Sequence, residues 1–209
     1  DERTASPTAP QISLQSPGGG DAWDGIQTVS WTSDDLDEDD LTFTVLYSQD
    51  GGDSWKPVAI DLSDYSHRLD TTSLPGSDHA RVRVLVSDGF HTASADSGSF
   101  SVPTKAPYVQ ISTPSEGVAL LPQQATVLDG SAYDPEQGYL SGKALSWWSD
   151  RDGLLGRGDT VILPALTLSP GQHVITLKAT DEDQQMGEAR IRVFVGLRFY
   201  LPTILRGGE

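Results

Sequence analysis

The 209-residue chain contains no cysteine and no asparagine, and it has a single methionine. Without thiols it can form neither a disulfide nor a thiolate metal site. Without asparagine it offers no acceptor for N-linked glycosylation. The lack of cysteine does not locate the protein, because a secreted chain can fold without disulfides.

Basic residues are also scarce. The chain has 14 Lys and Arg against 30 Asp and Glu, a net charge of −16, and residues 1–103 hold 18 of the acidic residues but only 5 of the basic ones. Such a surface repels nucleic-acid phosphates and anionic lipid. We therefore predict that the protein does not bind nucleic acid.

Long apolar runs are missing as well. No segment approaches the roughly 18 consecutive apolar residues of a spanning helix, so no membrane span is predicted. Residues 1–9 are rich in Pro, Ser and Thr and lack the features of a signal peptide. We interpret them as a linker from an upstream domain of the same polypeptide.

The sequence carries no recognisable catalytic motif. There is no His-Glu-x-x-His, no Gly-x-Ser-x-Gly and no phosphate-binding loop, and the four histidines are scattered. His173 follows a Pro-Gly turn at the start of an expected strand, where we expect it on the surface. The chain is therefore predicted not to be an enzyme.

What the sequence does contain is a succession of short alternating stretches separated by Gly, Pro, Ser and Asp, the pattern of a β-sandwich or barrel. Helical periodicity is almost absent. In the first half, strands are expected near residues 10–15, 26–32, 41–48, 55–60, 66–70, 80–87 and 98–102. In the second half, they are expected near residues 107–112, 124–132, 143–149, 159–164, 172–180 and 188–195.

One acidic strand–loop–strand pattern occurs in both halves. A strand leads into the acidic residues 34–40 in the first half and into residues 134–138 in the second, and an alternating strand follows each loop. Duplication of this kind predicts two similar domains. We expect an all-β chain of two tandem domains at 10–103 and 104–196, followed by a C-terminal tail at 197–209.

Both halves resemble immunoglobulin-like β-sandwich modules of secreted bacterial proteins. The first half is similar to a fibronectin type III-like or cadherin-like repeat, through Trp31, the acidic loop and segments 47–55, 74–77 and 86–89. The second is similar to a PKD-like or cadherin-like repeat, through segments 130–136, 147–153, 168–171 and 179–181. The resemblance implies two tandem immunoglobulin-like β-sandwich domains in a secreted or cell-surface protein. Such domains act as spacers, mediate adhesion or present an upstream domain.

The resemblance also predicts where carboxylates gather. In such a sandwich the loop after the second strand and the loop between the last two strands lie at the same end. Ca²⁺ takes six to eight oxygen ligands, which clustered carboxylates and loop carbonyls can supply. The alternative is that these acids are solvated turn residues. The candidate calcium ligands are Asp134, Glu136, Asp181 and Asp183 in the second half, and Asp35, Asp37, Asp39 and Asp88 in the first.

Two other functions stay open. Trp147 and Trp148 are adjacent on a strand and must point to opposite faces. The exposed one, with Tyr139, Trp23 or Trp55, could form a sugar-stacking platform, as in a carbohydrate-binding accessory domain of a secreted hydrolase. Alternatively, the apolar tail could add to a sheet edge and make the protein a fibre subunit. Polysaccharide or a surface protein is the expected external partner.

Overall fold

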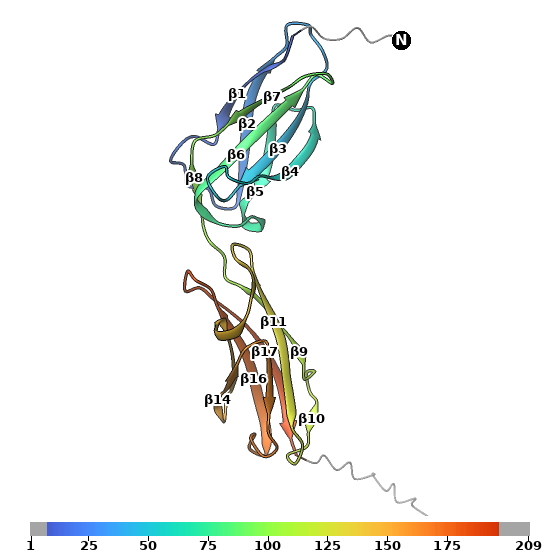
Figure 1. The fold of residues 1–209 in the computed structure, drawn as a ribbon, viewed down its shortest axis with the longest axis vertical. Coiled ribbons are helices and arrows are strands. Elements are labelled where there is room, and N and C mark those ends of the chain that lie inside the picture. Colours follow the sequence, from blue (N-terminus) through green and yellow to red (C-terminus); the bar gives the residue numbers. More distant parts are fainter. Residues whose placement is uncertain (1–7, 197–209) are drawn as a thin grey trace, which may run out of the picture. The chain divides into compact units, whose positions relative to one another are not determined.

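The computed structural model describes residues 8–196, which form two compact units that divide between Lys105 and Ala106. Both units are built from β-strands, and the only helices among the described residues are two 3-10 turns, Thr71–Ser73 and Gly142–Ala144 (Figure 1). Neither turn, nor any other described segment, is a helix long and apolar enough to cross a membrane. The expected tail at 197–209 lies outside the described residues.

The N-terminal unit is a sandwich of two antiparallel sheets. One sheet has the order β1-β2-β5, and the other has the order β4-β3-β6-β7 with β8 also pairing with β6. This is the layered arrangement of an immunoglobulin-like domain. Its strands are β1 (Gln11–Ser16), β2 (Ile26–Asp34), β3 (Thr42–Ser48), β4 (Lys56–Leu62), β5 (Ser66–Asp70), β6 (Ser77–Ser87), β7 (Thr92–Asp96) and β8 (Phe100–Val102).

Alternation of buried and less buried residues, clearest along β6, builds the core of this unit. In β6 every second residue from Ala80 to Val86 is fully buried, and the residues between them are half-buried. Trp31 of β2 packs against Phe43 of β3, with ring centroids 5.3 Å apart, and joins the two sheets. Burial of this aromatic and aliphatic surface is the main stabilising contribution in each layer.

The C-terminal unit is a second sandwich. One sheet has the order β10-β17-β16-β13-β14, in which the short β10 runs parallel to β17. The other sheet is centred on β11, which pairs with β9, β12 and β15. The strands are β9 (Tyr108–Thr113), β10 (Ala119–Leu120), β11 (Thr126–Asp134), β12 (Gly138–Leu140), β13 (Leu145–Ser149), β14 (Gly153–Arg157), β15 (Thr160–Leu163), β16 (Gly171–Thr180) and β17 (Met186–Val195).

Trp147 on β13 is the largest fully buried side chain of this unit. Its indole N–H donates to the carbonyl of Gly158, 3.0 Å away, so the one polar atom of the ring is satisfied inside the core. Trp148, the next residue, is half-buried on the opposite face of the strand, as the alternation of β-strands requires.

The predicted fold class, all-β with two tandem immunoglobulin-like β-sandwich domains, is confirmed. The sequence did not indicate the short or weakly apolar strands β7, β10, β12 and β14. The expectation for His173 was wrong. This side chain is fully buried, because it continues the inward alternation of Ile175 and Leu177 along β16.

Candidate functional site

The acidic loop, residues 34–40 between β2 and β3, brings three predicted calcium ligands together. One carboxylate oxygen from each of Asp35, Asp37 and Asp39 lies within 4.8 Å of the other two. Within the described range 8–196, no other group of three Asp, Glu, His or Cys side chains meets this criterion. Of the eight candidate ligands, the structure gathers these three.

Asp35 organises this loop. Its Oδ1 accepts the backbone N–H of Asp37 at 2.8 Å and that of Asp39 at 3.5 Å, so the chain folds around the carboxylate. Its Oδ2 is buried and accepts no hydrogen bond within the described part of the chain. A buried carboxylate oxygen without a donor is costly, and a cation or an ordered water would relieve that cost.

The surroundings of the loop are strongly acidic. The loop borders a solvent-open hollow of about 560 Å³, and none of the residues lining that hollow is cationic. Two unit charges about 5 Å apart repel each other by about 1 kcal/mol in water and by several times more in a partly desolvated site. The lining residues are Ser33, Asp34, Asp35, Glu38, Asp39, Asp40, Leu41, Thr42, Ser63 and Tyr65.

Asp88, expected to join this cluster, is engaged in its own turn instead. Its Oδ1 accepts the backbone N–H groups of Phe90 and His91 at 2.7 and 2.6 Å, and its Oδ2 lies 3.3 Å from Nδ1 of His91. The hydrogen bond from the His91 backbone is the main reason why the pKa of Asp88 lies below its ordinary value. The carboxylate therefore faces the backbone between β6 and β7.

The four candidate ligands of the C-terminal unit do not form a comparable cluster. Asp134 is buried, and its Oδ1 accepts the backbone N–H groups of Glu136 and Gln137 at 3.0 and 2.8 Å. Asp181 is also buried, and its Oδ1 accepts the N–H of Gln185 at 2.8 Å, whereas Asp183 is exposed. The two buried carboxylates turn inward because each caps its own loop. Calcium binding at these four residues stays a prediction.

Sequence reasoning missed a buried cluster at the other end of the same unit. Ser149 Oγ lies 2.9 Å from Nδ1 of His173, and His173 Nε2 lies 2.6 Å from the carbonyl oxygen of Ser169. Because a carbonyl can only accept, Nε2 carries the proton in the neutral ring and Nδ1 accepts from the serine hydroxyl. Asp152 approaches the same Nδ1, with its Oδ2 3.6 Å away.

This cluster lacks the geometry of a catalytic triad. In a triad the acid and the nucleophile contact opposite nitrogens of the imidazole, whereas here Ser149 and Asp152 both approach Nδ1. The serine Oγ also accepts the backbone N–H groups of Arg151 and Asp152, and His173 is inaccessible to solvent. The cluster fixes the turn between β13 and β14 to the start of β16.

Three of the tryptophans considered for a sugar-stacking platform are buried or half-buried. Trp23 is buried against Phe100, with ring centroids 5.0 Å apart. The guanidinium carbon of Arg83 lies 4.3 Å from the ring centroid of Trp55. Trp148 is half-buried, with the ammonium group of Lys178 5.5 Å from its ring centroid. A cation over an indole face is a stabilising contact that competes with a sugar for the same face.

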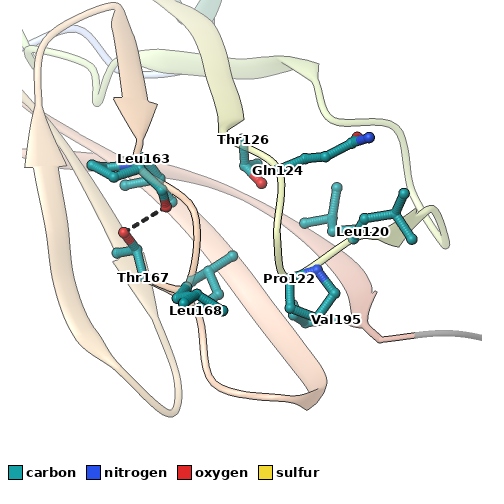
Figure 2. Close-up of a pocket in the computed structure, with 11 residues that line it drawn as sticks. Leu120, Pro122, Gln124, Thr126, Leu163, Thr167, Leu168 and Val195 are labelled. Atoms are coloured by element: carbon teal, nitrogen blue, oxygen red, sulfur yellow. Dashed lines mark hydrogen bonds between the residues drawn. The ribbon is translucent and has the colours of Figure 1, made fainter.

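Figure 2 shows an apolar pocket of the C-terminal unit, between Leu120, Pro122 and Val195 on one side and Leu163 and Leu168 on the other. Thr167 and Pro164 also line this pocket, and the Thr167 hydroxyl donates to the carbonyl of Pro164 at 2.8 Å. The space inside it is about 10 Å³, about enough for one water molecule. This pocket is therefore too small for an organic ligand.

No family model and no curated protein matches the chain. Among solved structures it is similar to the fibronectin(III)-like modules of Clostridium thermocellum CbhA, at 16% identity and a TM-score of 0.37, covering 88% of this chain and 94% of that one. It is also similar to the four N-terminal Ig domains of Dscam1 isoform 7.44, at 11% identity and a TM-score of 0.41, covering 91% of this chain and 47% of that one. Three N-terminal domains of the bacteriophage RB49 outer capsid protein Hoc match at 15% identity and a TM-score of 0.35, covering 90% of this chain and 59% of that one.

The strand order and register described above define the class of the protein, a tandem pair of immunoglobulin-like β-sandwich units. The chain spans about half of the matched Dscam1 structure. These similarities concern the fold.

Proposed function

We propose that the chain is a non-catalytic extracellular module, secreted or at the cell surface, that spaces or presents an upstream domain of the same polypeptide. The observation that carries this proposal is how the chain uses its buried ionisable side chains. Asp88, Asp134 and Asp181 each accept backbone N–H groups of their own turn, and His173 is held by Ser149 and a carbonyl. Such groups stabilise loops and have no access to a substrate.

We further propose that the acidic loop holds Ca²⁺, which stiffens the end of the N-terminal unit. Three carboxylates within 4.8 Å and the buried Oδ2 of Asp35 support this part of the proposal. Ca²⁺ takes its remaining ligands from loop carbonyls and water, so three carboxylates are a sufficient anionic set. Bound cation would remove the repulsion that the acidic loop otherwise carries.

The test is thermal unfolding of the chain in EDTA and in millimolar CaCl₂. A ligand that binds only the folded state adds about 2.7 kcal/mol at a hundredfold excess over its dissociation constant. For a domain of this size that corresponds to an increase in Tm of about 10 °C. Asp35→Asn combined with Asp39→Asn should abolish the increase, whereas Asp53→Asn, an exposed acid outside the loop, should leave it unchanged.

An unchanged melting curve in CaCl₂ would reject calcium at the acidic loop. The non-catalytic part of the proposal has its own test, which is hydrolysis of ester and glycoside substrates by the wild type and by Ser149→Ala. We expect no turnover from either protein. Turnover that is lost in Ser149→Ala would show that the buried cluster is catalytic after all.

A further inference from the structure

The outer face of one sheet in the C-terminal unit carries a row of exposed tyrosines. Tyr133 on β11 pairs with Tyr108 of β9 on one side and with Tyr139 of β12 on the other. Side chains at directly opposite positions of antiparallel strands lie on the same face. Tyr108, Tyr133 and Tyr139 therefore form one row across three strands, the tyrosine row; β9 and β11 lie side by side in Figure 1.

The row is not part of the core. The three side chains are 65%, 45% and 81% exposed, whereas their neighbours Val109 and Ala132 point inward and pack in the hydrophobic core. Isolated exposed aromatics are ordinary, but a contiguous aromatic patch on a soluble domain marks an interaction site. Two steps between neighbouring strands make the row about 10 Å long.

The chemistry around the row favours an uncharged partner that forms hydrogen bonds. Apart from the tyrosines, the outward-facing side chains of β9 and β11 are Gln110, Ser112, Val127, Asp129 and Ser131, and none of them is cationic. The one carboxylate among them, Asp129, already accepts the hydroxyl of Thr160 at 2.6 Å. An anionic ligand would find no counter-charge on these two strands, in a chain with a net charge of −16.

The polar groups lie beside the rings rather than among them. Gln110 and Ser131 are register partners, two positions along their strands from Tyr108 and Tyr133, and both are exposed. The face thus combines aromatic rings, which stack on C–H surfaces, with an amide and a hydroxyl that can both donate and accept hydrogen bonds. A sugar ring has the matching surface, with apolar C–H faces and a rim of hydroxyl groups.

We propose that the tyrosine row binds a single chain of an uncharged polysaccharide, a function beyond the spacing and calcium roles proposed above. The rings of Tyr133 and Tyr139 lie 5.3 Å apart and meet at 73°. Rings in this edge-to-face arrangement do not form a flat shelf. The site therefore fits a single chain, whereas the flat surface of a crystalline polymer would require coplanar rings.

The test is native affinity electrophoresis in gels that contain hydroxyethyl cellulose, arabinoxylan or galactomannan, with polygalacturonate as the anionic comparison. Because the protein is acidic, it migrates well in a native gel without polymer, so slower migration in a gel that contains polymer is easily measured. We expect retardation by at least one of the three neutral polymers and none by polygalacturonate. No retardation by any neutral polymer overturns the proposal, as does retardation by polygalacturonate alone.

Substitutions of the tyrosines test whether polysaccharide binds at the tyrosine row. Tyr133→Ala combined with Tyr139→Ala should weaken binding about tenfold or more, as for the loss of a central anchor. Tyr139→Phe should bind nearly as well as the wild type, since it keeps the ring. Phe90→Ala, which removes an exposed aromatic of the N-terminal unit, is the matched control and should bind unchanged.

Two further results would overturn the assignment. One is unchanged binding by Tyr139→Ala, a variant that does not threaten folding because the side chain is 81% exposed. The other comes from sedimentation velocity without polymer. A wild type that dimerises and a double variant that stays monomeric would identify the row as a contact between copies of this chain. A failure of calcium binding leaves these readouts unaffected, because the acidic loop belongs to the other unit.

Discussion

Gly130→Ala, which adds a single methyl group, should destabilise the C-terminal unit and so tests how closely its strands pack. Gly130 is buried on β11 at a register shift opposite Ile111 of β9. An alanine Cβ there would lie 2.6 Å from the carbonyl oxygen of Gln110 and 2.6 Å from a methyl group of Leu177. Carbon atoms do not approach so closely, and the carbonyl cannot move without separating β9 from β11.

The magnitude follows from two opposing effects. Overpacking a well-filled core costs about 1 to 3 kcal/mol and sometimes more. The alanine regains about 0.4 to 1 kcal/mol because it restricts the unfolded chain. Since a backbone atom is among the contacts, we expect the upper part of the range, a net loss of about 2 kcal/mol from the free energy of unfolding of this unit.

Urea or thermal unfolding followed by two-dimensional NMR would report on the two units separately. Gly130→Ala should lower the stability of the C-terminal unit and leave the N-terminal unit unchanged. Gly19→Ala is the matched control, because its Cβ would meet only the Cα of Gly98 at 3.8 Å. A loss below about 0.5 kcal/mol in Gly130→Ala would refute the close approach of β9 to β11, and with it the register that forms the tyrosine row.

Two other predictions follow from hydrogen-bonded polar side chains. The pKa values of Asp88 and Asp96 are lowered, chiefly by hydrogen bonds from the His91 backbone and from the Arg83 side chain. For a carboxyl group with a depressed folded-state pKa, the stabilisation is present above the unfolded value of about 4 and is lost as the pH falls through the folded value. The Tm of the N-terminal unit should therefore decrease as the pH is lowered below about 4. The Tm of Asp88→Asn should decrease less over the same pH range. An equal decrease in the variant would contradict the stabilising role given to the Asp88 carboxylate. In the C-terminal unit, His173→Phe should lower the free energy of unfolding by about 1 to 3 kcal/mol, because the Ser149 hydroxyl and the Ser169 carbonyl lose a buried partner. An unchanged free energy in urea unfolding would show that these hydrogen bonds do not stabilise the unit.

The sequence predicted the architecture well because alternation and turn residues are local signals. Strands such as β6 and β16 carry long inward runs of aliphatic residues, so they could be located without knowledge of their partners. The strand β7, with the sequence Thr-Ala-Ser-Ala-Asp, has no such run and is held by its pairing with β6. Burial of His173 could have been read from its spacing to Ile175 and Leu177, but the Pro-Gly turn before it suggested a surface position.

The two candidate sites differ in the same way, since one lies within a single loop and the other depends on the pairing of several strands. The Asp35, Asp37 and Asp39 group lies within one loop, and its alternate spacing was visible in the sequence. The tyrosine row depends on the register of three strands, and register is a property of the sheet rather than of any one segment. Only Tyr139 was selected from the sequence, because nothing local connects Tyr108 to Tyr133.

The acidic loop is the site that both the sequence and the structure select, and a calcium titration followed residue by residue by NMR tests it most directly. Asp37 and Asp39 donate their backbone N–H groups to Oδ1 of Asp35, so these amide resonances should move together as Ca²⁺ binds. The amides of Glu136, Gln137 and Gln185, which report on Asp134 and Asp181, should stay in place. Shifts confined to those three amides, or none at millimolar Ca²⁺, would contradict the assignment of the metal to the acidic loop.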